Sequence, residues 1–291
     1  MSAIGAFVKT DATSRPVIVA IGGFDPTGGA GVVRDFLTAR TLGAAVRLVP
    51  TAWTEQSPGG VRSIEPRGPS ALGAAVRGAL QSIKRDGSDP GRTEVCVAVK
   101  IGMLPDAPSA AAVGEALGDF GGPIVLDPVL TASSGGDLFV GEVAALVDLG
   151  RRVTLTTPNA SEAAALAGLP VKNAADAAGA GAELHRRGLG AVLVKGGHLV
   201  GPDCVDILVS GAGVRPFPGR RVPGPSVRGT GCALATAIAV GLGRHLSLEQ
   251  AIVAAKDWLA DAIARAVDTG DEWHLPIDSR AGLRDEPSGS V

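Results

Sequence analysis

The chain has 291 residues, of which 45 % are hydrophobic and 19 % charged, and its formal net charge is −2. These values permit a large core, and they exclude both a disordered chain and a strongly basic protein that binds nucleic acid. Widely spaced cysteines, no apolar stretch of the ~20 residues that cross a bilayer and no signal-peptide pattern predict a cytoplasmic protein without a membrane partner.

The first predicted elements alternate between strand and helix. The apolar run at 17–21 predicts a strand that is buried on both faces. A glycine-rich loop at 22–31 follows, and we expect a helix from there to Leu42. The next segments indicate a strand at 45–49 and a polar loop at 51–60.

The rest of the chain repeats this alternation. Apolar runs predict strands at 95–101, 124–126, 153–155 and 191–194. Helical spacing predicts helices at 69–84, 107–119, 140–149, 161–168, 173–187, 231–243 and 248–268, and a hairpin spans 204–217. The pattern is typical of an α/β fold with a mostly parallel sheet covered on both faces. We find no linker, so we expect one domain over 1–291 with loosely held extensions at 1–15 and 270–291.

Polar residues follow several of the predicted strands directly. They are Asp25, the segment 100–103, Asp127, the segment 157–159 and the segment 195–198. Ligands of such sheets bind beyond the carboxyl ends of the strands. These clusters therefore predict an active edge.

A Gly-Thr-Gly-Cys sequence at 229–232 precedes an apolar run that predicts a buried helix. Small residues at a helix start leave backbone N–H groups accessible, and the helix dipole adds positive charge, which suits a phosphate or a transferring phosphoryl group. Cys232 would lie in the first turn, where the pKa of a thiol is normally lowered. The alternative is a glycine-rich turn with a buried structural cysteine.

The sequence lacks a P-loop, a dinucleotide fingerprint, a nucleophile elbow and a zinc-protease motif. Six other motifs occur in order: Gly-Phe-Asp-Pro-Thr-Gly-Gly-Ala-Gly at 23–31, Lys-Ile-Gly-Met-Leu at 100–104, Leu-Asp-Pro-Val at 126–129, Thr-Pro-Asn-x-x-Glu at 157–162, Lys-Gly-Gly-His at 195–198 and Gly-Thr-Gly-Cys at 229–232. Together they resemble the hydroxymethylpyrimidine/phosphomethylpyrimidine kinases of thiamine biosynthesis, within the ribokinase-like superfamily, over residues 17–268. The resemblance implies a three-layer α/β/α fold, commonly a homodimer, and ATP-dependent phosphorylation of a pyrimidine alcohol and then of its monophosphate.

The resemblance also implies roles on the phosphate side of the site. Backbone N–H groups of Gly229, Thr230 and Gly231 would form an anion hole, and Thr230 would also contact ATP. Cys232 stands where most ribokinase-like enzymes have an Asp that deprotonates the acceptor. We leave open whether this cysteine is the general base or only positions the substrate.

Four further residues are candidates for binding ATP and Mg²⁺. Asp127 and Glu162 would hold the ion, and Asn159 would bind a phosphate or a metal-bound water. Alternatively, Asn159 and Glu162 cap the following helix, and this role is compatible with catalysis. Lys195 would reach the ATP phosphates, and its alternative is a solvated lysine.

The resemblance places the acceptor near Gly23, Asp35, Gln56, Met103 and Val129. Gln56 would pair with an aminopyrimidine, because an amide matches a ring nitrogen beside an amino group. For Asp35 the alternative is an exposed helix carboxylate, and for Met103 it is a core position. Two other motif residues have their own alternatives: Lys100 could be a strand-end charge facing water, and His198 a residue of an ordered turn.

The chain departs from the family pattern at five positions. Phe24, Trp53 and Glu55 would narrow or change the acceptor pocket, and Arg228 and Ala233 would alter contacts to nucleotide or phosphate. Two rival functions stay open on the sequence: a pyridoxal/pyridoxine kinase, and a non-catalytic ligand-binding domain derived from a kinase.

Overall fold

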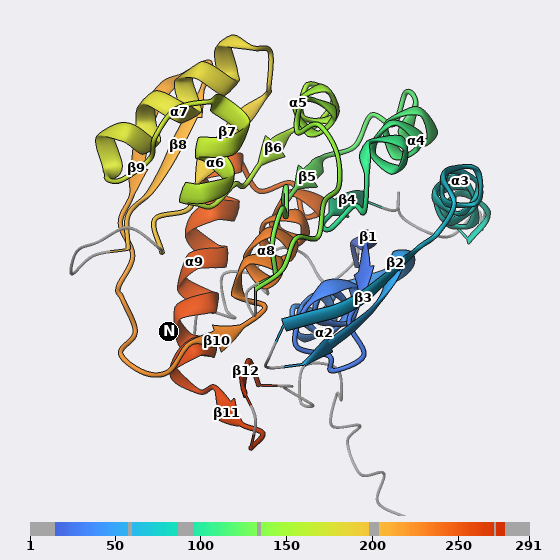
Figure 1. Ribbon diagram of the computed structural model, residues 1–291, viewed down its shortest axis with the longest axis horizontal. Helices are drawn as coiled ribbons and strands as arrows, with labels where there is room; N and C mark the ends of the chain where they lie inside the picture. The colour runs from blue at the N-terminus through green and yellow to red at the C-terminus, as the bar shows by residue number, and fades with distance from the viewer. Residues whose placement is uncertain are drawn as a thin grey trace, which may run out of the picture.

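A nine-stranded sheet runs through the middle of the molecule, with helices on both of its faces (Figure 1). The computed structural model describes residues 15–57, 60–86, 96–132, 135–197, 204–270 and 272–276. The strand order is β3-β2-β1-β4-β5-β6-β7-β8-β9. The strands are β1 Val17–Phe24, β2 Ala45–Ser57, β3 Gly60–Pro66, β4 Val97–Ile101, β5 Ile124–Leu126, β6 Leu155–Thr156, β7 Ala191–Val194, β8 Asp206–Ser210 and β9 Gly213–Phe217. The strands from β2 to β7 in this order pair in parallel, and β3, β8 and β9 add antiparallel edges.

The helices form two layers, one on each face of the sheet. One layer holds α3 Pro69–Asp86, α4 Ala107–Leu117, α5 Ala144–Gly150, α6 Ala160–Ala167 and α7 Ala174–Arg186. The other holds α2 Gly31–Thr41, α8 Thr230–Gly243 and α9 Leu248–Ala264. Each helical layer packs on its face of the sheet through a hydrophobic core. Side chains alternate along β1, so that Val19 packs in the core beneath α3 to α7 and Ile18 in the core beneath α2, α8 and α9. The predicted three-layer α/β/α architecture is confirmed.

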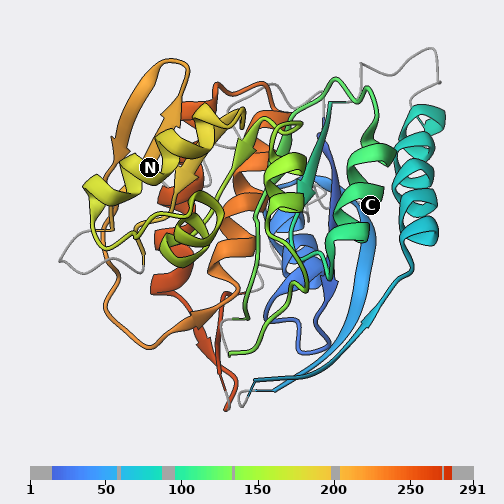
Figure 2. The ribbon, with the colours of Figure 1, turned by 45° about the horizontal axis from the view of Figure 1, so that its top comes forward.

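The predicted polar loop at 51–60 is wrong for residues 51–57 and 60, which lie in strands, whereas residues 58 and 59 lie outside the described residues. After pairing with β1, strand β2 runs on to Ser57 and pairs in antiparallel fashion with β3. Only every second residue of this extension is buried, such as Ala52 and Thr54, while Trp53 and Glu55 are exposed. A strand with one wet face therefore resembles a loop in its composition. Figure 2 shows the resulting β2–β3 hairpin reaching beyond the main sheet toward the C-terminal strands.

The end of the described chain folds back onto the site. Strands β10 Val227–Arg228, β11 Val267–Asp268 and β12 Trp273–His274 form a second, small sheet. Leu275 is buried in the core beside α2 and α8. The expectation of a loose segment over 270–291 is therefore wrong for residues 272–276, whereas residue 271 and residues 277–291 lie outside the described residues, as do residues 1–14 of the other expected extension.

Within the part of the chain that the structure describes, no helix has the length and apolar character that a membrane crossing requires.

Candidate active site

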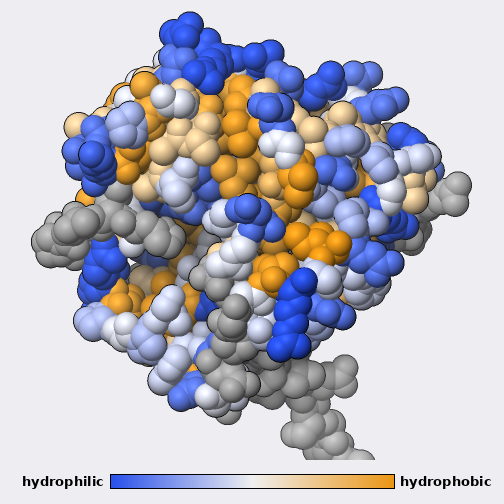
Figure 3. All heavy atoms as spheres, viewed as in Figure 1, coloured by the Kyte–Doolittle hydropathy of each residue, from blue (hydrophilic) through white to orange (hydrophobic). Residues whose placement is uncertain are grey.

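A cleft of about 1590 Å³ opens beyond the carboxyl ends of β1, β4, β5 and β7. The space-filling view shows hydrophilic and hydrophobic residues side by side on the face of Figure 1, with a recess left of its centre (Figure 3). All of the predicted site residues except Asp35 line this cleft. The predicted active edge is thus where the clusters come together, whereas the role of each residue stays a prediction.

The start of α8 forms one wall of the cleft. Gly229 has a left-handed backbone (φ 73°), and a Cβ there would lie 2.0 Å from the carbonyl oxygen of Gly29. Only glycine fits this position without strain. The first helical turn closes through the N–H of Ala233, which donates to the Gly229 carbonyl over 2.9 Å. The leading N–H groups, those of Thr230 and Gly231, have no partner within the helix and lie at the cleft.

Lys195 and two carboxylates face this helix start. The Lys195 Nζ atom donates to Asp127 Oδ1 over 2.6 Å and lies 4.0 Å from Glu162 Oε2. A Cβ on Gly231 would lie 3.4 Å from Lys195 Nζ and 3.7 Å from Asp127 Oδ2. The backbone of Gly231, a cation and a carboxylate therefore border the same small space. The alternative of a solvated lysine is wrong, because the Lys195 side chain is only 12 % exposed.

Burial shifts the ionisation of this group. Burial alone would lower the pKa of Lys195, but the carboxylates of Asp127 and Glu162 outweigh it and raise that pKa. Burial also raises the pKa of Glu162 to about 7, with Asp127 adding to the rise and Lys195 opposing it. Lys195 is therefore a fixed cation, and Glu162 exchanges a proton near neutral pH.

Asn159 and Glu162 form the capping box of α6, as one of the two readings predicted. The Asn159 side chain accepts from the N–H of Glu162 over 2.9 Å, and the Glu162 carboxylate accepts from the N–H of Asn159 over 2.7 Å. The backbone of Asn159 also bridges to Lys195 in parallel fashion. The cap therefore fixes both side chains beside Lys195 at the cleft.

The residues present fit a loosely held Mg²⁺. Lys195 and Thr157 both donate to Oδ1 of Asp127, whereas Oδ2 lies on the side of Gly231. Among the described residues no group of three or more His, Cys, Asp and Glu side chains is arranged to hold a metal. Mg²⁺ does not need one, because it commonly takes one or two carboxylates together with water and substrate phosphates. Asp127 and Glu162, which both line the cleft beside Lys195, can supply those carboxylates.

Cys232 does not have the lowered pKa that its place in the first turn of α8 predicts. Burial raises the pKa of the Cys232 thiol to about 11, and the carboxylates of Asp35 and Asp127 add to the rise. The Lys100 ammonium and a hydrogen bond from the backbone of Gly31 lower this pKa, but together they do not cancel the effect of burial and the carboxylates. The thiol is therefore neutral at pH 7.

Asp35 lies below the cleft rather than at it. Its side chain is fully buried, where Oδ2 accepts from Lys100 over 2.9 Å and Oδ1 accepts from Thr236 over 2.8 Å. Neither the predicted contact with the acceptor nor the exposed-carboxylate alternative agrees with this geometry. The alternative of a water-facing Lys100 is also wrong.

Lys100 is the residue that Asp35 holds at the cleft. Burial alone would lower the pKa of Lys100, but the Asp35 carboxylate raises it overall, so the lysine is charged. Side chains two apart on a strand share a face, and a Cβ on Gly102 would lie 2.5 Å from Lys100 Nζ. The glycine of the Lys-Ile-Gly motif therefore makes room for the ammonium group, a signal that could have identified Lys100 as buried.

The apolar part of the cleft lies under the β2–β3 hairpin. Met103 is 6 % exposed and packs with Ala52 and Leu138, with Val129 against them. A Cβ on Gly23 would lie 3.0 Å from the sulfur of Met103, so this glycine keeps the pocket open. Met103 is thus both a core residue and a lining residue.

The sequence departures on the acceptor side do not narrow the cleft. The rings of Phe24 and Trp53 pack on each other at 4.5 Å between centroids, and Trp53 is 56 % exposed. Neither these rings nor Glu55 line the cleft. His198 lies outside the described residues.

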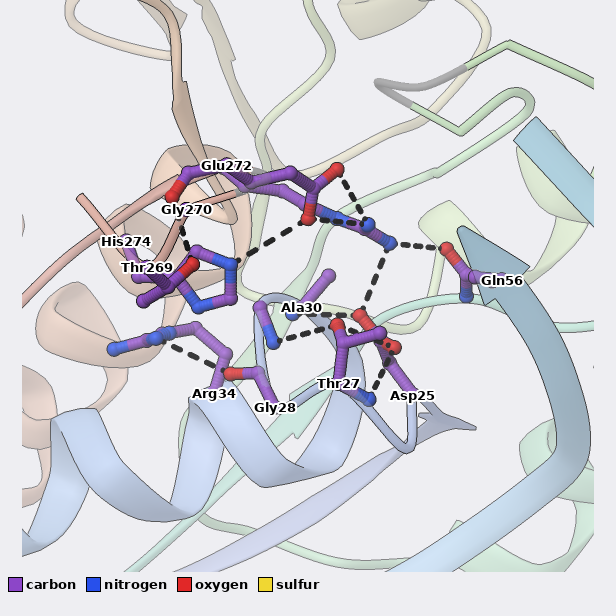
Figure 4. A network of polar contacts seen from close by, with 12 residues as sticks. Asp25, Thr27, Gly28, Ala30, Arg34, Gln56, Thr269, Gly270, Glu272 and His274 are labelled. Carbon is purple, nitrogen blue, oxygen red and sulfur yellow. Dashed lines mark hydrogen bonds and ion pairs between the residues drawn. The ribbon is translucent and has the colours of Figure 1, made fainter. Parts of the chain in front are cut away.

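Arg228, the departure beside the predicted anion hole, joins three distant segments of the chain. Figure 4 shows that Asp25, Gln56 and Glu272, one from each segment, lie close together. It is 6 % exposed and binds Asp25 in the first loop, Gln56 on β2 and Glu272 in the C-terminal segment. Asp25 in turn accepts from the N–H groups of Thr27 and Ala30 and so shapes the glycine-rich loop. Sequence reasoning singled out Asp25, Gln56 and Arg228 separately but missed the network, because its members are up to 247 positions apart and no local pattern shows that they meet.

Comparison with known proteins finds a matching family model and similar proteins. A family model described as phosphomethylpyrimidine kinase matches residues 25–278. The chain is 35 % identical over 253 residues to a hydroxymethylpyrimidine/phosphomethylpyrimidine kinase of Rhizobium meliloti (strain 1021), covering 86 % of this chain and 91 % of that protein.

Solved structures agree on the fold. A phosphomethylpyrimidine kinase from Clostridium difficile 630 superposes with a TM-score of 0.71 and 28 % identity, over 86 % of this chain and 99 % of that chain. A pyridoxal kinase from Staphylococcus aureus, in complex with AMP-PCP and pyridoxal, gives a TM-score of 0.76 over 90 % and 93 % of the two chains. At 22 % identity, the second likeness shows a shared fold alone.

Proposed function

Since the chain belongs to the phosphomethylpyrimidine kinase family, we propose that it transfers the γ-phosphoryl group of ATP to 4-amino-5-hydroxymethyl-2-methylpyrimidine and then to the monophosphate, in thiamine biosynthesis. One observation supports the chemistry most directly. The N-terminus of α8 shares a small space with Lys195 and Asp127, in a cleft that continues to Gln56 and Met103. A donor of phosphate and an acceptor of phosphate can therefore meet at one point.

The roles follow from charge and position. Phosphoryl transfer needs in-line placement of the reactants and compensation of charge on the nonbridging oxygens. The N–H groups of Thr230 and Gly231 would bind those oxygens, and Lys195 would add a fixed positive charge. Mg²⁺, held by Asp127 and Glu162, would neutralise further phosphate charge.

Cys232 fits a positioning role better than that of a base. A neutral thiol can donate a weak hydrogen bond to the hydroxyl group of the pyrimidine alcohol, or accept one from it. A loose transition state places little charge on the attacking oxygen, so its proton can leave late in the reaction. Lys100, charged and fixed by Asp35, lies close enough to influence this thiol.

The decisive experiment offers Mg-ATP with three acceptors to the purified protein: the pyrimidine alcohol, its monophosphate and pyridoxal. Mass analysis should find the pyrimidine monophosphate and then the diphosphate. A clear preference for pyridoxal would replace the proposed acceptor, and no transfer to any of the three would favour a non-catalytic binding domain.

Two further expectations need their own measurements. A homodimer stays a prediction, which light scattering on the purified protein would check. The cytoplasmic compartment also stays a prediction, which fractionation of cells would check.

A further inference from the structure

The guanidinium of Arg228 uses its terminal N–H groups on the protein itself. Nη1 donates to both carboxylate oxygens of Glu272 at 2.9 Å, and Nη2 donates to Asp25 over 3.1 Å and to the Gln56 carbonyl oxygen. These contacts occupy the donors that could otherwise bind a phosphate. Arg228 therefore orients protein groups at the cleft, although it stands next to the anion hole.

The hydrogen bonds of Arg228 fix which way the Gln56 carboxamide points. A guanidinium can only donate, so the Gln56 atom that faces it must be the oxygen Oε1. Nε2 then faces Thr54, and it donates to the hydroxyl over 2.7 Å. The Thr54 hydroxyl donates to the Phe24 carbonyl over 2.9 Å. Reversing the carboxamide would break two of these bonds and set N–H against N–H.

One donor and one acceptor of Gln56 are left for a ligand, and their order is set. Each carboxamide has two N–H donors and two oxygen lone pairs, of which Arg228 and Thr54 use one each. A 4-aminopyrimidine presents a ring-nitrogen acceptor beside an amino donor. The 4-oxo analogue in its usual N–H form presents the reverse order. A carboxamide that rotates freely could serve both, whereas a fixed one serves only one.

We propose that Arg228 is a specificity-determining positioning residue, which holds Gln56 in the orientation that accepts an amino-substituted ring and rejects the oxo-substituted one. The inference rests on the proposed function, because it concerns the acceptor of that reaction. It assigns to the departure at position 228 an effect on the acceptor, although this residue precedes the phosphate-binding turn in the sequence.

The test compares kcat/KM for the 4-amino and the 4-oxo pyrimidine alcohols within each variant. This ratio does not depend on how much of the protein is folded, so a purely structural defect leaves it unchanged. In Arg228→Met the ratio should fall roughly 10- to 100-fold, since a mispaired buried hydrogen bond has an effect of that size. The KM for ATP should stay within about threefold of that of the parent. If Arg228→Met does not fold, the double variant Arg228→Met/Glu272→Gln replaces it, because this variant also neutralises the carboxylate that loses its partner; the ratio should fall by the same factor, and an unchanged ratio would refute the role of Arg228.

Two controls separate orientation from general loosening. Glu272→Gln disturbs Arg228 from the other side but leaves the contact with Gln56, so the ratio should stay within about twofold. In a Gln56→Met background, Arg228→Met should no longer change the ratio, because its effect passes through the carboxamide.

The failures of the two proposals can be told apart. If the parent protein phosphorylates neither pyrimidine, the proposed function fails. If the parent prefers the amino compound and Arg228→Met keeps the same ratio, the role of Arg228 is refuted. The role of Arg228 would also be refuted if Glu272→Gln lowered the amino-to-oxo ratio of kcat/KM as much as Arg228→Met does. It would likewise be refuted if Arg228→Met still changed this ratio in the Gln56→Met background.

Discussion

Replacing Gly231 by alanine separates the chemistry of the helix start from its stability. Built on the present backbone, the new Cβ would lie 3.4 Å from Lys195 Nζ and 3.7 Å from Asp127 Oδ2, which are ordinary contact distances. Alanine is also a better helix former than glycine by about 1 kcal/mol. The free energy of unfolding of Gly231→Ala should therefore be unchanged or rise by up to ~1 kcal/mol.

The same methyl group fills the space between Lys195, Asp127 and the helix start, where we place the phosphoryl oxygens. Loss of one preorganised donor to such oxygens typically lowers kcat about 10²- to 10³-fold. We expect a loss of this size for Gly231→Ala in a coupled ATP assay with saturating acceptor. Thermal unfolding of the same preparation supplies the stability measurement.

Gly229→Ala is the matched control for this substitution. Its Cβ would lie 2.0 Å from the Gly29 carbonyl oxygen, and its φ of 73° disfavours any L-residue by roughly 1–2 kcal/mol. This variant should lose stability as well as activity. A Gly231→Ala protein with near-normal kcat and normal stability would refute the assignment of the anion hole.

Three further predictions follow from the buried charges around the cleft. Cys232→Ser should lower kcat less than about tenfold, because a neutral hydroxyl replaces a neutral thiol. A loss of kcat near 10³-fold would instead support the hypothesis that Cys232 acts as a thiolate base. The folded-state pKa of Glu162, about 7, lies above its ordinary 4.5, so the folded chain holds this proton more tightly, and the resulting stabilisation is present below pH 4.5 and lost as the pH rises through 7. In urea unfolding, Glu162→Gln should then be more stable than the parent by about 1–3 kcal/mol at pH 8.5 and similar to it at pH 4; equal stability at both values would contradict the shift. Gly102→Ala must displace the ammonium of Lys100 and should lower the free energy of unfolding by about 1–3 kcal/mol. Asp35→Asn leaves that buried cation unpaired and should lower the free energy of unfolding by about 3–5 kcal/mol. If neither variant changes the free energy of unfolding, the ion pair between Asp35 and Lys100 is refuted.

The active edge could be predicted from sequence because its geometry is a property of parallel sheets. Asp127 and Lys195 each follow a short apolar run, and carboxyl ends of parallel strands meet at one edge. The register of β5, β6 and β7 then brings the two side chains to 2.6 Å without any local signal between them. Local patterns sufficed here because each residue is attached directly to a strand end.

Contacts between distant segments could not be predicted in this way. Nothing local to Asp35 shows that Lys100 lies opposite, because the pairing depends on how α2 packs against β1, the neighbour of β4 in the sheet. Likewise, Glu272 lies in a polar stretch that local composition assigns to a loose tail, and only β10 and β12 bring it to Arg228. Long-range ion pairs satisfy a buried charge wherever the fold delivers a partner, so sequence spacing carries no trace of them.

Cys232 shows how two correct local rules can give opposite results. A helix N-terminus favours a negative charge by about 0.3–1 kcal/mol at exposed sites. The rise in the pKa of Cys232 from its ordinary 9.0 to about 11 corresponds to roughly 3 kcal/mol in the other direction, because burial and two carboxylates disfavour the thiolate. The phosphates of ATP would bring further negative charge to the same space. A thiolate would compete with those phosphates for the N–H groups of the helix start, whereas a neutral thiol leaves them free to bind the group that is transferred.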